Sequence, residues 1–201
     1  MSKQPAFSPS DITGVILAGG LATRMGGADK GLQAYMGKRL VEHVIEKLAP
    51  QVGQLLINAN RNQAVYAELG LPVIGDEIGN FPGPLAGLHT GLRHARGDWV
   101  LTAPCDSPGV PEKLALTLAP PCQAGARLAI ARHRGRLHPV FCLCHRSVLS
   151  PLENYLKNDG RRVAAWCQAM GASIVDFPDE DGLFTNFNTL ADLGLAPPLG
   201  A

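Results

Sequence analysis

The feature that most constrains the fold is an apolar run at residues 12–17 that leads directly into a glycine-rich loop. The run reads ITGVIL, so it is short, rich in β-branched residues and continuous rather than alternating. This pattern is typical of a parallel strand that is buried on both faces. Parallel strands cannot be joined by a tight turn, so a crossover must follow. The first crossover helix is expected at residues 40–48, where apolar residues recur at helical spacing.

Helical and extended patterns alternate along the rest of the chain. Further strands are expected at residues 54–58, 72–74, 99–103, 128–131, 139–143 and 172–177. Further helices are expected at residues 63–69, 84–95, 111–118, 147–157 and 162–170. Alternation in this order predicts an α/β fold with a mostly parallel sheet and right-handed crossovers.

Length and composition favour one compact domain. The chain has 201 residues, of which 46% are hydrophobic and 17% are charged, so it can bury one sizeable core. We expect a single domain over residues 1–201, with flexible tails at residues 1–10 and 195–201.

Charge and cysteine usage exclude several classes of protein. The net charge is +1, so no bulk field attracts a nucleic acid. No run approaches the roughly 18 apolar residues of a membrane span, and the N-terminus lacks the apolar core of a secretory signal. The five cysteines form an odd set without CxxC spacing, which argues against disulfides and structural zinc. We therefore expect a cytoplasmic protein that binds neither nucleic acid nor membrane.

The loop after the first expected strand is suited to binding phosphate. It contains four glycines, Gly19, Gly20, Gly26 and Gly27. Glycine allows backbone N–H groups to approach a phosphate without a Cβ in the way, although a simple tight turn would use the same residues. The loop matches neither the P-loop nor the dinucleotide-binding motif. Arg24 and Lys30 favour a phosphate site over solvated surface cations, because together they can neutralise a triphosphate and its pyrophosphate leaving group.

Asp106 is the candidate metal ligand. It follows the expected strand at residues 99–103 and precedes the turn residues Ser107 and Pro108. We expect its carboxylate to be exposed at the carboxyl edge of the sheet, where α/β proteins bind ligands. A carboxylate there suits Mg²⁺, which prefers hard oxygen ligands completed by phosphate oxygens and water. An aspartate that opens a turn or caps a helix is the alternative interpretation.

Six motifs in one order resemble those of a known family. They are VILAGGLATRMGGADK at residues 15–30, NAN at 58–60, Asp76, PGPLAG at 82–87, PCDSP at 104–108 and NFNT at 186–189. Together they are similar to the bacterial molybdenum cofactor guanylyltransferase family, and the match runs from about residue 12 to residue 193. The opening loop is shared with the wider nucleotidyltransferase superfamily, whereas the ordered set of six is specific to the smaller group.

The resemblance implies a three-layer, Rossmann-like nucleotidyltransferase fold. It implies transfer of GMP from GTP, with Mg²⁺ as cofactor, to the terminal phosphate of molybdenum-bound molybdopterin. The products would be the molybdopterin guanine dinucleotide cofactor and pyrophosphate. The implied partners are GTP and molybdenum-molybdopterin, together with molybdenum-insertion proteins and molybdoenzyme chaperones, and the expected state is a monomer.

Roles carry over to this chain by position. The resemblance assigns catalysis to Arg24 on the leaving pyrophosphate, Lys30 on the phosphates and Asp106 on Mg²⁺. It assigns nucleotide binding to Leu17, Ala18, Gly19, Gly20, Lys30, Asn58, Asp76, Gly83 and Asp106. Among these, Asn58 and Asp76 would contact the guanosine portion. No general base is expected, because an acceptor phosphate is already ionised at pH 7.

Two groups in the second half are candidates for contacting the acceptor. Asn186 and Asn188 lie two residues apart and project to the same side if the chain is extended. By analogy with related nucleotidyltransferases Asn188 is also a candidate second metal ligand, with an Asx-turn as the alternative. The second group is a basic cluster that either meets the pterin phosphate or forms a solvated loop: Arg132, His133, Arg134, Arg136, His138, Arg161 and Arg162.

Three other functions share part of this pattern. A cytidylyltransferase acting on the same pterin would have the same fold, metal and reaction, but Gly20 and the segment at residues 84–87 favour GTP over CTP. A sugar-phosphate nucleotidyltransferase would need a hydroxyl-lined sugar pocket, of which the second half of the chain shows no sign. A non-catalytic carrier that hands the pterin to its apoenzyme would have no need for Arg24, Lys30 and Asp106.

Overall fold

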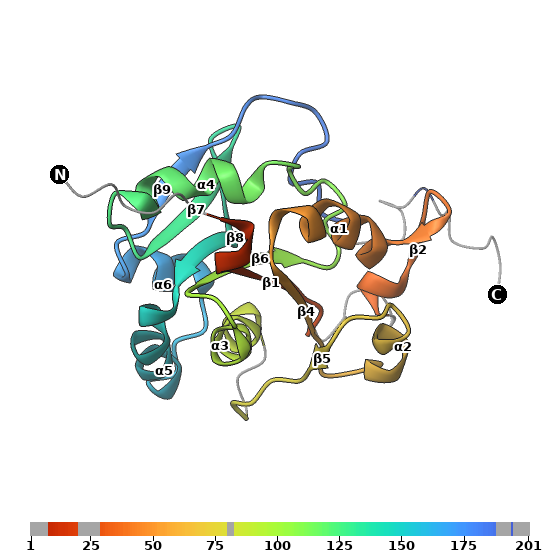
Figure 1. The fold of residues 1–201 in the computed structure, drawn as a ribbon, viewed down its shortest axis with the longest axis horizontal. Helices are drawn as coiled ribbons and strands as arrows, with labels where there is room; N and C mark the ends of the chain where they lie inside the picture. The colour runs from red at the N-terminus through yellow and green to blue at the C-terminus, as the bar shows by residue number, and fades with distance from the viewer. Residues whose placement is uncertain (1–7, 20–28, 80–82, 188–193, 195–201) are drawn as a thin grey trace.

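The structure, a computed structural model, describes residues 8–19, 29–79, 83–187 and 194 (Figure 1). These residues form a seven-stranded sheet in the order β5-β4-β1-β6-β8-β7-β9. The strands are β1 Ile12–Leu17, β4 Gln54–Asn58, β5 Val73–Ile74, β6 Trp99–Pro104, β7 Leu128–His133, β8 Arg136–His145 and β9 Ser173–Asp176. Each strand predicted from the sequence therefore has a counterpart.

The sheet is built around β1, which is buried along its whole length and runs parallel to β4 and β6. Strand β5 is parallel to β4, and β9 is parallel to β7. Strand β8 is antiparallel to both of its neighbours, β6 and β7. The prediction of an α/β fold with a mostly parallel sheet is therefore confirmed.

Helices cover both faces of the sheet. They are α1 Leu40–Leu48, α2 Gln63–Ala67, α3 Pro84–His94, α4 Leu114–Gln123, α5 Leu149–Lys157 and α6 Val163–Ala169. Helices α1 and α4 pack on one face, and α3, α5 and α6 pack on the other (Figure 1). Successive residues of β1 serve the two faces, since Ile16 belongs to the first cluster whereas Val15 and Leu17 belong to the second. The result is the three-layer arrangement that the resemblance implied.

Helix α4 differs from its prediction. The sequence placed a helix at residues 111–118, but α4 spans Leu114–Gln123 and includes Pro120 and Pro121. Residues 111–113 form a turn instead, in which the Leu114 N–H donates to the Pro111 carbonyl oxygen at 3.2 Å. The two prolines lack N–H donors, yet their carbonyl oxygens still accept bonds from the residues beyond the helix. Tertiary packing of the buried α4 face overrides the usual effect of proline.

The basic segment at residues 132–138 is a hairpin rather than the solvated loop considered above. Strands β7 and β8 pair through it as far as His133 opposite Arg136. Its turn residues, Arg134 and Gly135, have φ angles of 49° and 74°, which is the backbone of a tight two-residue hairpin turn. A smaller unpredicted hairpin joins β2 Ala34–Tyr35 to β3 Lys38–Arg39.

Two further observations complete the fold. Of the predicted tails, residues 8–10 are described and lead into the short 3-10 helix Pro9–Asp11, whereas the rest lie outside the described residues. Within the described part of the chain, no helix is both long and apolar enough to cross a bilayer.

Candidate active site

A cavity of about 710 Å³ opens at the carboxyl ends of the parallel strands. One wall is formed by the ends of β1 and β4, the floor includes the end of β6, and the opposite wall is the start of β8 with residues 184–186. This edge of an open α/β sheet is where such folds bind ligands. The volume is in the range of pockets that enclose small-molecule ligands. Many of the predicted site residues lie around this one cavity.

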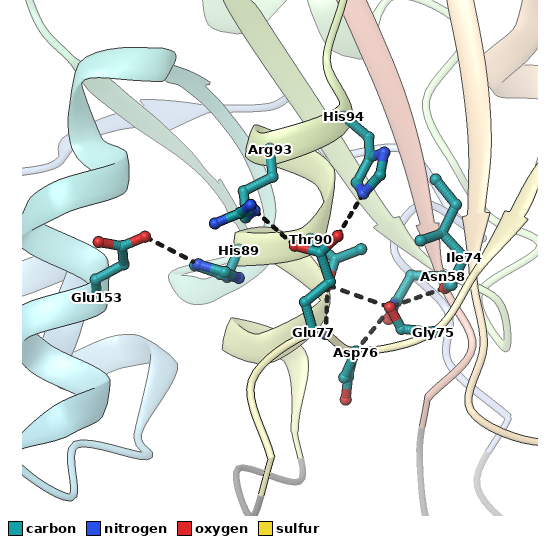
Figure 2. Close-up of polar contacts among 10 residues, drawn as sticks. All are labelled: Asn58, Ile74, Gly75, Asp76, Glu77, His89, Thr90, Arg93, His94 and Glu153. Atoms are coloured by element: carbon teal, nitrogen blue, oxygen red, sulfur yellow. Dashed lines mark hydrogen bonds and ion pairs between the residues drawn. The ribbon is translucent and has the colours of Figure 1, made fainter.

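Asn58, which lines the first wall, belongs to a closed set of hydrogen bonds around Asp76. The Nδ2 atom of Asn58 donates to Asp76 Oδ1 at 2.9 Å, and that of Asn60 donates to Asp76 Oδ2 at 2.7 Å. The backbone N–H of Asp76 donates in turn to Asn60 Oδ1 at 2.7 Å. Asn58 and Asp76, the two residues to which the resemblance gives the guanosine portion, are therefore hydrogen-bonded to each other, and Asn60 joins them (Figure 2 shows Asn58 and Asp76). Asn60 belongs to the NAN motif at residues 58–60, so the sequence contained a signal that pointed to it.

Glycines make room for this set of bonds. A Cβ at Gly19 would lie 3.2 Å from Asn60 Nδ2 and 3.4 Å from Asn58 Oδ1. A Cβ at Gly87 of α3 would lie only 2.3 Å from Asn58 Oδ1, so any side chain there would displace the amide. The end of β1 is fixed as well, because the Ala18 N–H donates to the Asn58 carbonyl oxygen at 2.8 Å. The Ala18 N–H is thus already hydrogen-bonded to the neighbouring strand.

Lys30 and Asp106 meet on the floor of the cavity. Lys30 Nζ lies 3.2 Å from Asp106 Oδ2, and the two side chains are 21% and 12% exposed. The prediction that the Asp106 carboxylate is exposed was wrong. Lys30 lies against this carboxylate, and the Phe187 N–H donates to the backbone carbonyl oxygen of Asp106 at 3.0 Å. Burial raises the pKa of the Asp106 carboxyl above its usual value, and the nearby Lys30 opposes that rise.

The position of Lys30 is set by a residue that sequence reasoning missed. Asp29 precedes it and caps the 3-10 helix η3 Lys30–Leu32 by accepting from the Gly31 N–H at 3.2 Å. The same carboxylate accepts from the Tyr66 hydroxyl at 2.6 Å and from Asn62 Nδ2 at 3.1 Å. Burial raises the pKa of Tyr66 far above its usual range, so this hydroxyl stays a donor. An aspartate directly before a short helical turn was the available signal.

The opposite wall is aromatic and basic. The His138 ring stacks on Phe184 with ring centroids 4.7 Å apart and an interplanar angle of 24°. Phe184 is held edge-on by Phe141 and Phe177 at 4.9 and 5.0 Å. Arg136 lines the cavity beside His138. Burial, followed by the charge of Arg136, lowers the pKa of His138.

The rest of the basic cluster has other partners. Arg132 forms a two-pronged pair with Asp176, with both N···O distances at 2.6 Å. Arg134 pairs with Asp179 and Asp181. Of the seven predicted basic residues, Arg136 and His138 are the two that line the cavity in the described structure.

Some of the remaining predicted site residues are described by the structure, and others are not. Leu17, Gly83 and Asn186 line the cavity, and Gly83 stands directly before α3. The predictions for Gly20, Arg24 and Asn188 lie outside the described residues.

The donor set on the floor fits a magnesium ion held mainly by its substrate. Within the described residues no three His, Cys, Asp or Glu side chains gather as a metal cage. Mg²⁺ in phosphate-transfer sites does not need one, because one or two carboxylates suffice when phosphate oxygens and water complete the shell. Asp106 is such a carboxylate, buried and at the cavity.

Comparisons with known proteins agree with this geometry. Residues 14–172 match the family model described as "MobA-like NTP transferase domain". A Ralstonia nicotianae protein named molybdenum cofactor guanylyltransferase is 46% identical over 194 residues, covering 92% of this chain and 95% of its own. A Vibrio cholerae protein of the same name is 45% identical over 197 residues, covering 96% and 97%.

Solved structures show the same fold. Molybdopterin-guanine dinucleotide biosynthesis protein A from Archaeoglobus fulgidus superposes with a TM-score of 0.71 at 24% identity, covering 90% of this chain and 95% of its own. The 4-diphosphocytidyl-2C-methyl-D-erythritol synthase of Anaerococcus prevotii reaches 0.71 at 11% identity, covering 92% and 93%.

Proposed function

The chain belongs to the molybdenum cofactor guanylyltransferase family, and on that premise we propose that its cavity transfers GMP from GTP to molybdenum-bound molybdopterin. The observation that carries the proposal is the meeting of Lys30 and Asp106, 3.2 Å apart, on the floor between two unlike walls. One wall presents the Asn58 amide, which is hydrogen-bonded to Asp76, and the other presents a flat aromatic stack and a guanidinium. A phosphate-transfer reaction with two substrates needs a separate surface for each substrate, and the two walls can provide these surfaces.

The first wall is assigned to the guanosine portion. Asp76 accepts one amide N–H on each carboxylate oxygen, which leaves further lone pairs for donors on the nucleoside. Asn58 is held by Asp76 and by the Ile74 carbonyl oxygen at 3.2 Å, so its amide has a fixed orientation. Gly19 and Gly83 also line the cavity, where their lack of a Cβ would give a ligand access to the backbone.

The floor is assigned to the triphosphate. Lys30 supplies a cation beside Asp106, and Arg24 and the backbone of Gly20 are proposed to meet the phosphates from the loop at residues 19–28. Asp106 would hold Mg²⁺, with Asn188 proposed as a second ligand. When bound, Mg²⁺ would neutralise phosphate charge and polarise the phosphorus centre that is attacked.

The chemistry is an in-line displacement at the α-phosphorus of GTP. An oxygen of the acceptor phosphate forms the new P–O bond, and the bond from the α-phosphorus to the bridging oxygen breaks, so that pyrophosphate leaves with the electron pair. The acceptor oxygen is already ionised, so no residue has to remove a proton. The task left to the protein is to align two polyanions and to reduce their repulsion, which Lys30 does on the floor and Arg24 is proposed to do beside it.

The second wall is assigned to the acceptor. The stacked rings of His138 and Phe184 provide a platform for a flat pterin, and Arg136 beside it provides a fork for a phosphate. Asn186 lies on the same side of the cavity, and Asn188 is proposed to join it. The family assignment further leads us to propose a monomer that works with molybdenum-insertion proteins and molybdoenzyme chaperones.

The test is a turnover assay with purified protein, molybdenum-loaded molybdopterin, Mg²⁺ and either GTP or CTP. We expect pyrophosphate release and dinucleotide formation with GTP, at a rate at least ten-fold above that with CTP. Preference for CTP would identify a cytidylyltransferase. Tight GTP binding without Mg²⁺-dependent turnover would identify a non-catalytic carrier, and either result would overturn the proposal.

A further inference from the structure

The segment at residues 75–77, which carries Asp76, is attached to helix α3 by one buried hydroxyl. Thr90 is 1% exposed. Its Oγ1 donates to the Gly75 carbonyl oxygen at 3.4 Å and accepts from the Glu77 N–H at 3.3 Å. Figure 2 shows both bonds reaching from α3 to the loop. A single side chain therefore holds the backbone on each side of Asp76.

Glu77 gives the loop a second attachment to α3. Its carboxylate accepts from Arg93 Nε and from His94 Nε2, both at 2.6 Å (Figure 2). The three side chains are between 33% and 52% exposed, so these pairs stabilise the fold little. These two pairs do restrict the position of Glu77, which directly follows Asp76.

Helix α3 is itself fixed against the sheet that carries Asn58. A Cβ at Gly91 would lie 2.6 Å from Val15 Cγ2 of β1, and one at Gly87 would lie 2.3 Å from Asn58 Oδ1. On its other side α3 is joined to α5 by the buried His89, whose Nε2 lies 3.2 Å from Glu153 Oε1. These contacts hold helix α3 in a fixed position between Asn58 and the loop of Asp76.

We propose that Thr90 is a positioning residue for nucleotide recognition, and that it holds the Asp76 carboxylate at the distance from Asn58 that guanosine requires. Asp76 has amide partners on the strand side, and Thr90, supported by Glu77, fixes it on the helix side. The inference rests on the proposed function, because it takes Asp76 to be a nucleotide ligand. Thr90 does not line the cavity, so its role is to position the loop of Asp76.

The first experiment compares Thr90→Val with Thr90→Ser. Valine keeps the shape of threonine and removes the hydroxyl, whereas serine keeps the hydroxyl. We expect Thr90→Val to raise the Kd for GTP in the presence of Mg²⁺, and the KM for GTP, by about five-fold, as the loss of a hydrogen bond predicts. The kcat at saturating GTP should stay within about two-fold, and Thr90→Ser should restore the affinity.

Thr13→Val is the matched control. Thr13 is also fully buried, its hydroxyl donates to Gln54 Oε1 at 2.9 Å, and it accepts from the Arg96 N–H at 3.2 Å. It lies near the start of β1, at the end of the strand away from the cavity. Its loss should lower the melting temperature as Thr90→Val does, and should leave the Kd and KM for GTP unchanged.

A double-mutant cycle separates positioning from a general structural role. If Thr90 acts through Asp76, then Thr90→Val should weaken GTP binding by less than about two-fold in an Asp76→Ala background. Equal losses with and without Asp76, or a Thr90→Val protein with wild-type affinity, would overturn the inference. Should Thr90→Val not fold, Glu77→Ala replaces it, with an expected rise in Kd of about two- to three-fold, and no rise would count against the inference.

The result for the wild-type protein distinguishes this inference from the proposed function. Failure of the wild-type protein to bind GTP would overturn both. Wild-type binding and turnover with an unaffected Thr90→Val variant would overturn the positioning role alone.

Discussion

Lys30 Nζ and Asp106 Oδ2, which belong to residues 76 positions apart in the chain, lie 3.2 Å from each other at the floor of the cavity. The pair joins η3 to the turn that follows β6. Because both side chains are largely buried, each depends on the other for its charge to be tolerated. The behaviour of this pair can be tested directly.

Asp106→Asn should fold normally and lose turnover. The amide fills the same space but carries no charge for a cation, so we expect kcat to fall by roughly 10²- to 10³-fold, in the range seen when an electrostatic contact to the reacting group is removed. Pyrophosphate release measures the loss, and the melting temperature controls for folding. Near-normal turnover would contradict the role given to Asp106.

The stability of the metal-free protein should reveal the raised pKa of Asp106. A carboxyl whose pKa is raised on folding is harder to ionise in the folded state, so its ionisation costs stability. That cost is absent below the ordinary aspartate value of 3.8, grows as the pH rises toward the higher folded pKa, and is constant beyond it. Asp106→Asn should therefore gain stability relative to the wild type across this window.

Urea unfolding in EDTA at a series of pH values measures this difference. Lys30 lowers the Asp106 pKa, so Lys30→Ala should extend the window to higher pH. A difference in unfolding free energy between wild type and Asp106→Asn that does not change with pH would count against the burial of an ionisable Asp106.

Gly87→Ala should damage nucleotide binding through Asn58. Its Cβ would lie 2.3 Å from Asn58 Oδ1 and 2.6 Å from Leu17 Cδ2, distances that force both residues to move. We expect the KM for GTP to rise by about ten-fold, equal to about 1.4 kcal/mol. Gly79→Ala is the control, because nothing lies within 4 Å of the added Cβ. Equal effects of the two substitutions would refute the explanation.

Arg136→Ala should weaken binding of the acceptor but not of GTP. Arg136 lines the cavity, whereas Arg132 on the same hairpin is paired with Asp176. Loss of one charged contact to a phosphate predicts a rise of about ten-fold in the KM for molybdopterin. Arg132→Ala is the matched variant, and it should leave both KM values within about two-fold. A larger effect from Arg132 would place the acceptor elsewhere.

Local patterns in the sequence predicted the framework well. The apolar run at residues 12–17 is a buried parallel strand, and Ala18 and Gly19 directly after it line the cavity. Asn58 and Asp76, which the motifs singled out, are hydrogen-bonded to each other. These successes share one cause: a strand buried on both faces has a continuous apolar pattern, and parallel strands bring their carboxyl ends to one edge.

Features that depend on distant contacts were missed. The burial of Asp106 requires Lys30 and the backbone of Phe187, and the anchoring of Asp29 requires Tyr66, none of which adjoins its partner in sequence. Arg132 and Arg134 pair with acids at residues 176–181, whereas Arg136 lines the cavity, and this division depends on residues far away in the sequence. No local pattern carries that information.

The reversed direction of β8 has a consequence for how such an enzyme can diversify. Because β8 runs antiparallel to β6 and β7, its first residues, 136–141, line the cavity together with residues 184–186, on the side opposite Asn58. The parallel half of the sheet, with Asn58 and the loop of Asp76, contributes nothing to these two segments. Under the proposed assignment, a change of acceptor would fall on these two short segments, and the residues assigned to the nucleotide could stay unchanged.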